Sequence, residues 1–104
     1  MAEEAAPQDR YSAKETEAMD LVNKGNDYAA KGFAQLNAKD VADGCANLVK
    51  ARETLDQAEA VIGELITLAA DDPVKQKSYK DLKVAGQSAV DDAAHAIIER
   101  CPRS

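Results

Sequence analysis

Apolar residues recur at intervals of three and four along almost the whole chain, and this spacing most constrains its fold. Such a stripe covers one face of an α-helix, whereas a half-buried strand would alternate apolar and polar residues with period two. The sequence contains no stretch with that alternation. We therefore expect an all-α protein.

Local chemistry divides the chain into three expected helices. Ser12 and Glu15 fit a capping box, which predicts a helix start at this point. Asp40 is a suitable N-cap for a second helix, and Asp72-Pro73 combines an N-cap with proline at the first helical position. The expected helices cover about 13–37, 41–70 and 73–100 within a bundle formed by residues 12–104, and residues 1–11 are expected to be a polar, disordered tail.

Each expected helix carries one apolar stripe in which small residues are frequent. Hydrophobic residues make up 45% of the chain and aromatic residues only 4%, so the expected core is aliphatic and closely packed. Short connections between the helices predict an up-down-up three-helix antiparallel bundle. The stripes consist of Ala18, Val22, Gly25, Ala29, Gly32 and Leu36, then Val41, Cys45, Leu48, Leu55, Ala58, Ile62, Leu65 and Ala69, and finally Tyr79, Leu82, Gly86, Val90, Ala93, Ile97 and Cys101.

The two cysteines lie at nearly equal distances along the chain from Asp72-Pro73. If the second and third helices fold back on each other at this point, Cys45 and Cys101 face each other at the open end of the hairpin. Neighbouring helices can bring two Cα atoms within the roughly 7 Å that a disulfide requires. We predict one disulfide between Cys45 and Cys101 that bridges helices 2 and 3, with two buried thiols as the alternative.

A disulfide indicates an oxidising compartment. The expected location is therefore periplasmic or secreted, with a signal peptide that is absent from the given sequence, and a cytoplasmic location is the alternative. The most apolar run, AVIGELITLAA, contains Glu64 and is much shorter than the roughly 20 residues that span a bilayer. No transmembrane segment is expected.

The chain carries 13 basic and 19 acidic residues, a net charge of −6. This balance argues against nucleic acid or an anionic membrane as the main partner and favours a protein partner with a basic surface. On the hairpin itself, antiparallel packing would set Glu64 near Lys83, and Arg52 near Asp91 or Asp92, with a solvated surface of mixed charge as the alternative. The sequence does not indicate an oligomeric state. The acidic residues outside these pairs are the candidate partner-binding residues: Asp20, Asp27, Asp40 and Asp43.

Metal and cofactor chemistry has few candidates. Asp91, His95 and Glu99 lie on one helix face and are weak candidates for a metal site, but a di-metal bundle needs a second such motif on another helix. Haem would have to be held by Met19 and His95, which lie about 20–25 Å apart along the bundle in the expected topology. We therefore expect no metal, no cofactor and an exposed His95.

Nucleophilic catalysis is also not indicated. No serine has an evident histidine partner, and both cysteines are expected to be used in the disulfide. The predicted function is a non-catalytic, exported helical protein that binds another protein as an adaptor, a chaperone-like factor or an inhibitor or immunity protein. The alternative is a bundle that binds a small ligand or a metal in a cavity between its helices.

Overall fold

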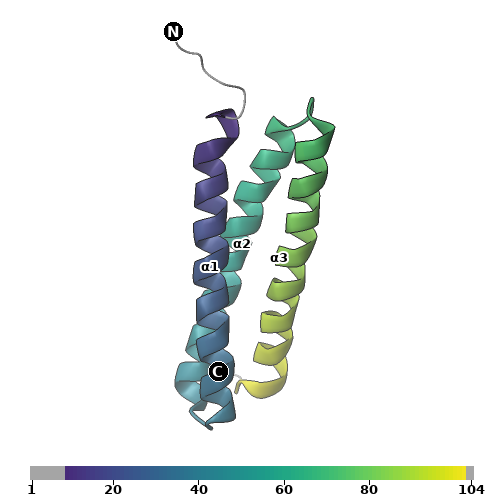
Figure 1. The fold of residues 1–104 in the computed structure, drawn as a ribbon. Helices are drawn as coiled ribbons and strands as arrows, with labels where there is room; N and C mark the ends of the chain where they lie inside the picture. The colour runs from purple at the N-terminus through teal and green to yellow at the C-terminus, as the bar shows by residue number, and fades with distance from the viewer. Residues whose placement is uncertain (1–8, 103–104) are drawn as a thin grey trace.

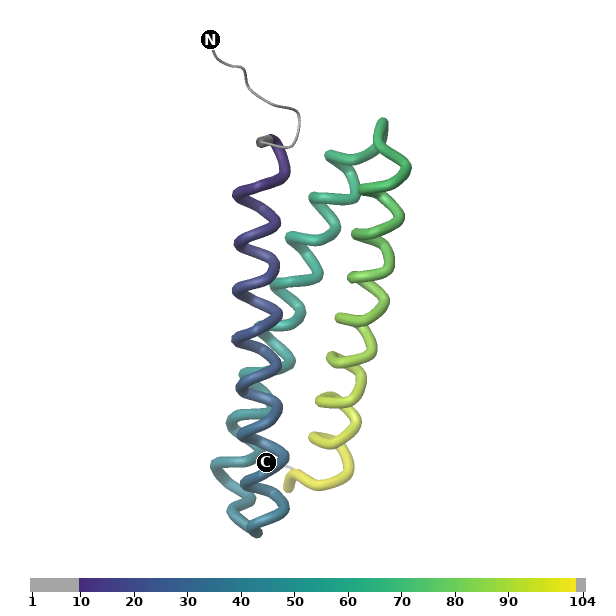
Figure 2. The backbone as a smooth tube through the Cα atoms, in the orientation of Figure 1, coloured from purple at the N-terminus to yellow at the C-terminus, as the bar shows by residue number. Residues whose placement is uncertain are grey.

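The computed structural model describes residues 9–102, which form three long helices (Figure 1). The first, α1, spans Asp9–Asn37, α2 spans Val41–Leu68, and α3 spans Pro73–Arg100. Successive helices run in opposite directions, as the tube in Figure 2 shows, and no strand occurs within residues 9–102. The predicted all-α, up-down-up bundle is confirmed.

The start of α1 differs from the prediction. The helix already includes residues 9–11, which the sequence places in a disordered tail, and Ser12 lies inside the helix and does not cap it. The cause is Tyr11, which is only 2% exposed and whose ring lies 5.9 Å from that of Tyr79 on α3. Burying this large side chain favours the additional helical residues. Residues 1–8 of the predicted tail lie outside the described residues.

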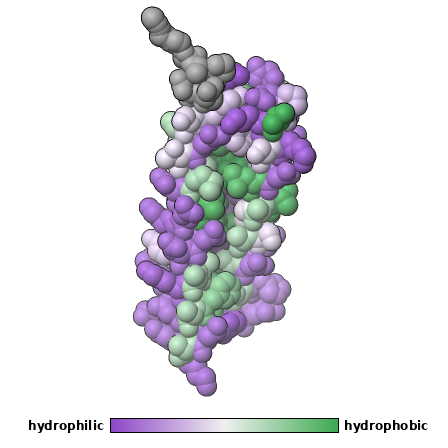
Figure 3. Space-filling model, viewed as in Figure 1, coloured by the Kyte–Doolittle hydropathy of each residue, from purple (hydrophilic) through white to green (hydrophobic). Residues whose placement is uncertain are grey.

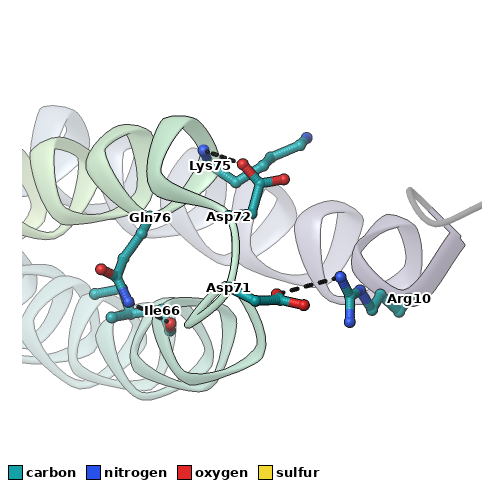
Figure 4. Close-up of polar contacts among 6 residues, drawn as sticks. All are labelled: Arg10, Ile66, Asp71, Asp72, Lys75 and Gln76. Atoms are coloured by element: carbon teal, nitrogen blue, oxygen red, sulfur yellow. Dashed lines mark hydrogen bonds and ion pairs between the residues drawn. The ribbon is translucent and has the colours of Figure 1, made fainter.

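The connection between α2 and α3 follows the predicted cap (Figure 4). The Asp72 side chain accepts a hydrogen bond of 3.1 Å from the backbone N–H of Lys75, and Pro73 is the first residue of α3. The Gln76 side chain donates to the backbone carbonyl of Ile66, which joins the two helices beside the turn. Helix α2 ends at Leu68, before the predicted residue 70. It ends there because the next residues form turn hydrogen bonds, such as that from the Asp72 N–H to the Ala69 carbonyl.

The connection between α1 and α2 is held by the backbone. Asp40 precedes α2 as predicted, but its side chain makes no capping hydrogen bond. Its N–H instead donates to the carbonyl of Gln35 at 2.8 Å, and Lys39 adopts a left-handed conformation with φ of 67°. This pattern is a Schellman-type helix end, which satisfies backbone carbonyls of α1 without a side-chain cap.

Glycine allows α1 and α2 to approach very closely. A Cβ atom on Gly32 would lie 2.9 Å from the Gly44 carbonyl oxygen and 2.8 Å from Cγ of Leu48. A Cβ atom on Gly25 would lie 2.6 Å from Cγ of Leu55. Both leucines are almost completely buried against these glycines. The α1–α2 interface therefore depends on the absence of side chains at these positions.

The disulfide between α2 and α3 is confirmed. Cys45 and Cys101 are bonded, their Cα atoms are 5.9 Å apart, and their bond closes a separation of 56 residues. Val41 was placed on a core stripe but is 38% exposed, whereas Tyr11, Ala51, Val61 and Ala96 are buried without having been predicted. The core otherwise follows the predicted stripes, with Ala18, Leu36, Leu48, Leu55, Ala58, Ile62, Leu65, Ala69, Tyr79, Val90 and Ala93 buried.

Candidate binding groove between α1 and α3

Both α1 and α3 pack against α2, but they make very little contact with each other (Figure 1). In the described part of the chain, the polar contacts between α1 and α3 lie near the two ends of the bundle. At one end Glu15 contacts Lys75 and Tyr79, and at the other Arg100 donates a hydrogen bond of 3.3 Å to the Asn37 side chain. Between these two ends, α1 and α3 make few close contacts along their seam.

An apolar groove lies in this seam next to Glu15 and Tyr79. It has a volume of about 520 Å³. Ala18 and Met19 of α1 form one wall, Ser78 and Leu82 of α3 form the other, and Leu65 of α2 contributes the floor. Figure 3 shows apolar surface between more polar edges on the face where α1 and α3 lie side by side. Met19 is 43% exposed, which is high for a large apolar residue beside a core.

The end of the groove is closed by a charged network. Tyr79 donates a 2.5 Å hydrogen bond to the Glu15 carboxylate, and the Lys75 ammonium lies 3.0 Å from the same oxygen. The Lys75 ammonium also lies over the rings of Tyr11 and Tyr79, at 5.3 and 5.8 Å from their centroids. The Tyr79 hydrogen bond and the Lys75 charge lower the pKa of the Glu15 carboxyl. Burial and the hydrogen bond to Glu15 raise the pKa of the Tyr79 hydroxyl.

A second, more open depression lies between α1 and α2. It has a volume of about 680 Å³ and includes Leu21 and Val61 as well as the acidic side chains Glu17 and Asp20. It lies beside an interface in which the two helices are already packed closely. We therefore regard the groove between α1 and α3 as the better candidate site.

The four acidic candidates from the sequence are all exposed, but they do not form one surface. Asp20 and Asp27 lie two helical turns apart on α1, and Asp20 borders the depression between α1 and α2. Asp40 and Asp43 lie at the start of α2. The end of α1 lies about 15 Å beyond Asp27, at 1.5 Å per residue. The candidates are therefore two separate pairs, and neither pair lines the groove.

The weak metal candidates on α3 are engaged with neighbours on the same helix. His95 Nε2 lies 2.9 Å from a Glu99 carboxylate oxygen, and Gln87 donates a 2.9 Å hydrogen bond to Asp91. Residues 9–102 contain no group of three side chains arranged to hold a metal ion. Met19 lies in the groove beside Leu82, and His95 lies about 20 Å further along α3, so these two are not brought together.

The predicted ion pairs between α2 and α3 are wrong. Glu64 pairs with Lys14 of α1 and not with Lys83, because α1 packs closely along α2 and offers a nearer ammonium group. Within the described range Arg52 forms no ion pair, so its predicted pairing with Asp91 or Asp92 does not occur.

Glu59 was not singled out from the sequence, although its position is unusual. One of its carboxylate oxygens is buried and has no hydrogen-bond partner among the described residues. A Cβ atom on Gly86 would lie 3.7 Å from Cγ of Glu59, so the glycine leaves room for the side chain between α2 and α3. Burial raises the pKa of the Glu59 carboxyl, and the negative charge of Asp56 adds to this effect. The only sequence signal is that Glu59 and Gly86 face each other in the hairpin register.

Comparison with protein-family models, with curated proteins and with solved structures finds no match to this chain. None of the described helices combines the length and the apolarity needed to cross a bilayer. The fold and the groove define a disulfide-bonded three-helix bundle with one open seam.

Proposed function

We propose that this protein acts by binding another protein, as a non-catalytic adaptor, chaperone-like factor or inhibitor in an oxidising compartment. The observation that carries the proposal is the apolar groove between α1 and α3. Covering apolar surface is favourable by about 25 cal/mol per Å², so a partner that fills the seam gains binding energy from it. Exposed apolar surface with polar edges is typical of interaction sites.

The disulfide supports the proposed compartment. Cys45 and Cys101 are joined, and such bonds persist mainly in a periplasm or outside the cell. The bond also removes both thiols as nucleophiles, which agrees with a binding role for the bundle.

Small-ligand binding is the second candidate, and the size of the groove favours it. A volume of about 520 Å³ falls within the range of roughly 300–1,000 Å³ that is common for small-molecule sites. Glu15 and Tyr79 at one end would then provide the polar contacts that orient a ligand.

The experiment that separates these candidates uses the oxidised protein, immobilised in an extract of the compartment from which it is isolated. A protein partner should be retained in about equimolar amount, and native mass spectrometry of the purified chain should show no bound small molecule. Thiol labelling of the freshly isolated protein reports the compartment. Two reactive thiols would favour the cytoplasmic alternative, and a retained ligand without a protein partner would favour the second candidate.

A further inference from the structure

We propose that the groove between α1 and α3 receives one amphipathic helix of a partner protein, with basic residues along the edge that faces α3. This inference rests on the proposed function and names the chemistry of the partner. The docked helix would lie against α1, α2 and α3 and complete a four-helix arrangement, the packing that the open seam lacks.

The length of the seam suits a helix. Between the contacts at its two ends, the α1 wall of the seam extends from Met19 to Phe33, about 21 Å at 1.5 Å per residue. Met19 is exposed and Phe33 is half-buried, so both have apolar surface available to a partner. A partner helix of four turns would cover this length.

On either side of Leu82, the α3 wall presents small side chains. Ser78 lines the groove, and Ala85 lies two helical turns later on the same face and is exposed. Ala89, one turn beyond Ala85, is half-buried. Small residues let helix backbones approach closely, as Gly32 and Gly44 already do between α1 and α2.

Apart from Glu15, which pairs with Lys75, the edge of α1 beside the groove carries no charge. The residues of this edge form one helical stripe, at intervals of mostly four and three. Their lack of charge stands out because 31% of the whole chain is charged. The opposite face of the same helix contains Glu17, Asp20, Lys24, Asp27 and Lys31. An uncharged edge avoids the cost of desolvating ions when a partner docks. The stripe consists of Ser12, Met19, Asn23, Asn26, Ala30, Phe33 and Asn37, and Thr16 beside it lines the depression between α1 and α2.

The edge of α3 is acidic in contrast. Asp81 borders the groove, and Asp92 and Glu99 follow on the same face at intervals of about three and two helical turns. Asp81 pairs with Lys77 and Glu99 with His95 on the same helix, but these pairs are exposed and hold their partners weakly, so the carboxylates can exchange them for a docked basic residue. Glu15 and Lys75 at the groove also pair with each other. The complementary helix is therefore apolar on one face, basic beside α3 and uncharged beside α1. A second copy of this chain fits poorly, because each copy has a net charge of −6.

The probe for this proposal is a displayed library of helical peptides of about 21 residues, long enough to span the seam. Leucine and alanine are fixed on the apolar face, and lysine, glutamine and glutamate are varied at both flanks. Selection on the oxidised full chain should enrich lysine on one flank and glutamine on the other. Failure to enrich any peptide, or enrichment of glutamate on both flanks, would overturn the proposal.

Variants then test where a selected peptide binds. Ala85→Gln places a longer, uncharged side chain in the seam and should weaken binding by about tenfold or more. Val84→Gln is the matched control. The neighbouring Val84 is 70% exposed, and its substitution should leave the affinity for the peptide unchanged. Circular dichroism confirms that both variants fold. Equal affinities of the two variants would place the peptide elsewhere.

Charge variants test the orientation of the helix. The double variant Asp81→Asn with Asp92→Asn should bind the lysine-bearing peptide about three- to tenfold more weakly at low salt. Asp20→Asn with Asp27→Asn changes the net charge equally on the far face of α1 and should have little effect. A larger effect of this second pair would overturn the orientation. A dimer at about 100 μM that Ala85→Gln dissolves would identify a second copy as the occupant and overturn the choice of partner.

The two proposals fail in different ways. A native partner that is retained equally by Ala85→Gln and by the unmodified chain leaves the proposed binding function intact and contradicts the groove. Peptides that bind in the groove, without any native protein partner, support the groove and contradict the proposed function.

Discussion

Glu15 and Glu59 are both partly buried glutamates, yet their surroundings act on them in opposite directions. Glu15 accepts a hydrogen bond from Tyr79 and lies beside Lys75, so its charged form is stabilised and its pKa is lowered. Glu59 has a buried oxygen without a hydrogen-bond partner among residues 9–102, and burial raises its pKa. The ionised form of Glu59 is thus a cost to the folded state.

Glu59→Gln should stabilise the protein at pH 7, by about 1 kcal/mol, because an amide costs less to bury than a carboxylate. The pKa of Glu59 in the folded protein lies above its ordinary value of 4.5. As the pH falls through that raised pKa, the folded protein takes up the proton first, so the wild type gains stability relative to the variant. Below 4.5 the advantage of the variant should have disappeared, as measured by urea unfolding across pH.

Glu15→Gln is the matched control with the opposite sign. The pKa of Glu15 is lowered, so its contribution to stability is present above 4.5 and is lost as the pH falls through the lowered value. This variant should be less stable than the wild type at neutral pH. A stabilising Glu15→Gln, or a Glu59→Gln that destabilises at pH 7, would contradict this account of the two sites.

At the scale of the helices, the five glycines of the chain have different roles. Gly32 and Gly44 meet where α1 and α2 cross closely, and a side chain at either position would meet backbone atoms. Gly63 is also inside α2, but a Cβ atom there would have no neighbour within 4 Å. The sequence alone places the closely packed glycines and the unobstructed glycine on helices alike, and it cannot distinguish the two kinds.

Gly32→Ala should destabilise the protein by about 1–3 kcal/mol, because the Gly44 carbonyl oxygen cannot move away without separating the helices. Gly63→Ala should instead stabilise by about 0.5–1 kcal/mol, since alanine is the better helix former and nothing obstructs it. Chemical unfolding of the two variants measures both changes. Similar shifts in the same direction would mean that α1 and α2 are not in close contact at Gly32.

Local signals in the sequence predicted the elements well where the chemistry is local. Asp72 and Pro73 fix the start of α3 through one side-chain hydrogen bond and one restricted backbone angle, so the position could be read directly. The start of α1 depends on Tyr11 packing against Tyr79, a contact between distant residues that no local pattern reveals. The pairing of Glu64 with Lys14 was missed for the same reason.

The arrangement of the whole molecule was predicted in part. The positions of Cys45 and Cys101 gave the register of α2 and α3, because a disulfide can form only if the hairpin aligns them. Apolar stripes show which face of each helix is buried, but they do not show which pair of helices packs closely. The glycines of α1 bring it onto α2, so the seam with α3 remains open, and the groove could be located only in three dimensions.

The disulfide should hold the last turns of α3 against α2. Closing a separation of 56 residues stabilises by about 4 kcal/mol in the chain-entropy model. Cys45→Ser with Cys101→Ser should lower the free energy of unfolding by about this amount, as measured by urea titration. A reducing agent should have the same effect on the wild type and none on the variant.

Hydrogen exchange should increase most in the last turns of α3, since α1 stays packed on α2 through Gly32 and Gly44. A selected peptide that extends along the seam should then bind more weakly, because the part of α3 beyond the groove has become mobile. Unchanged stability after reduction would show that packing alone holds α3 against α2.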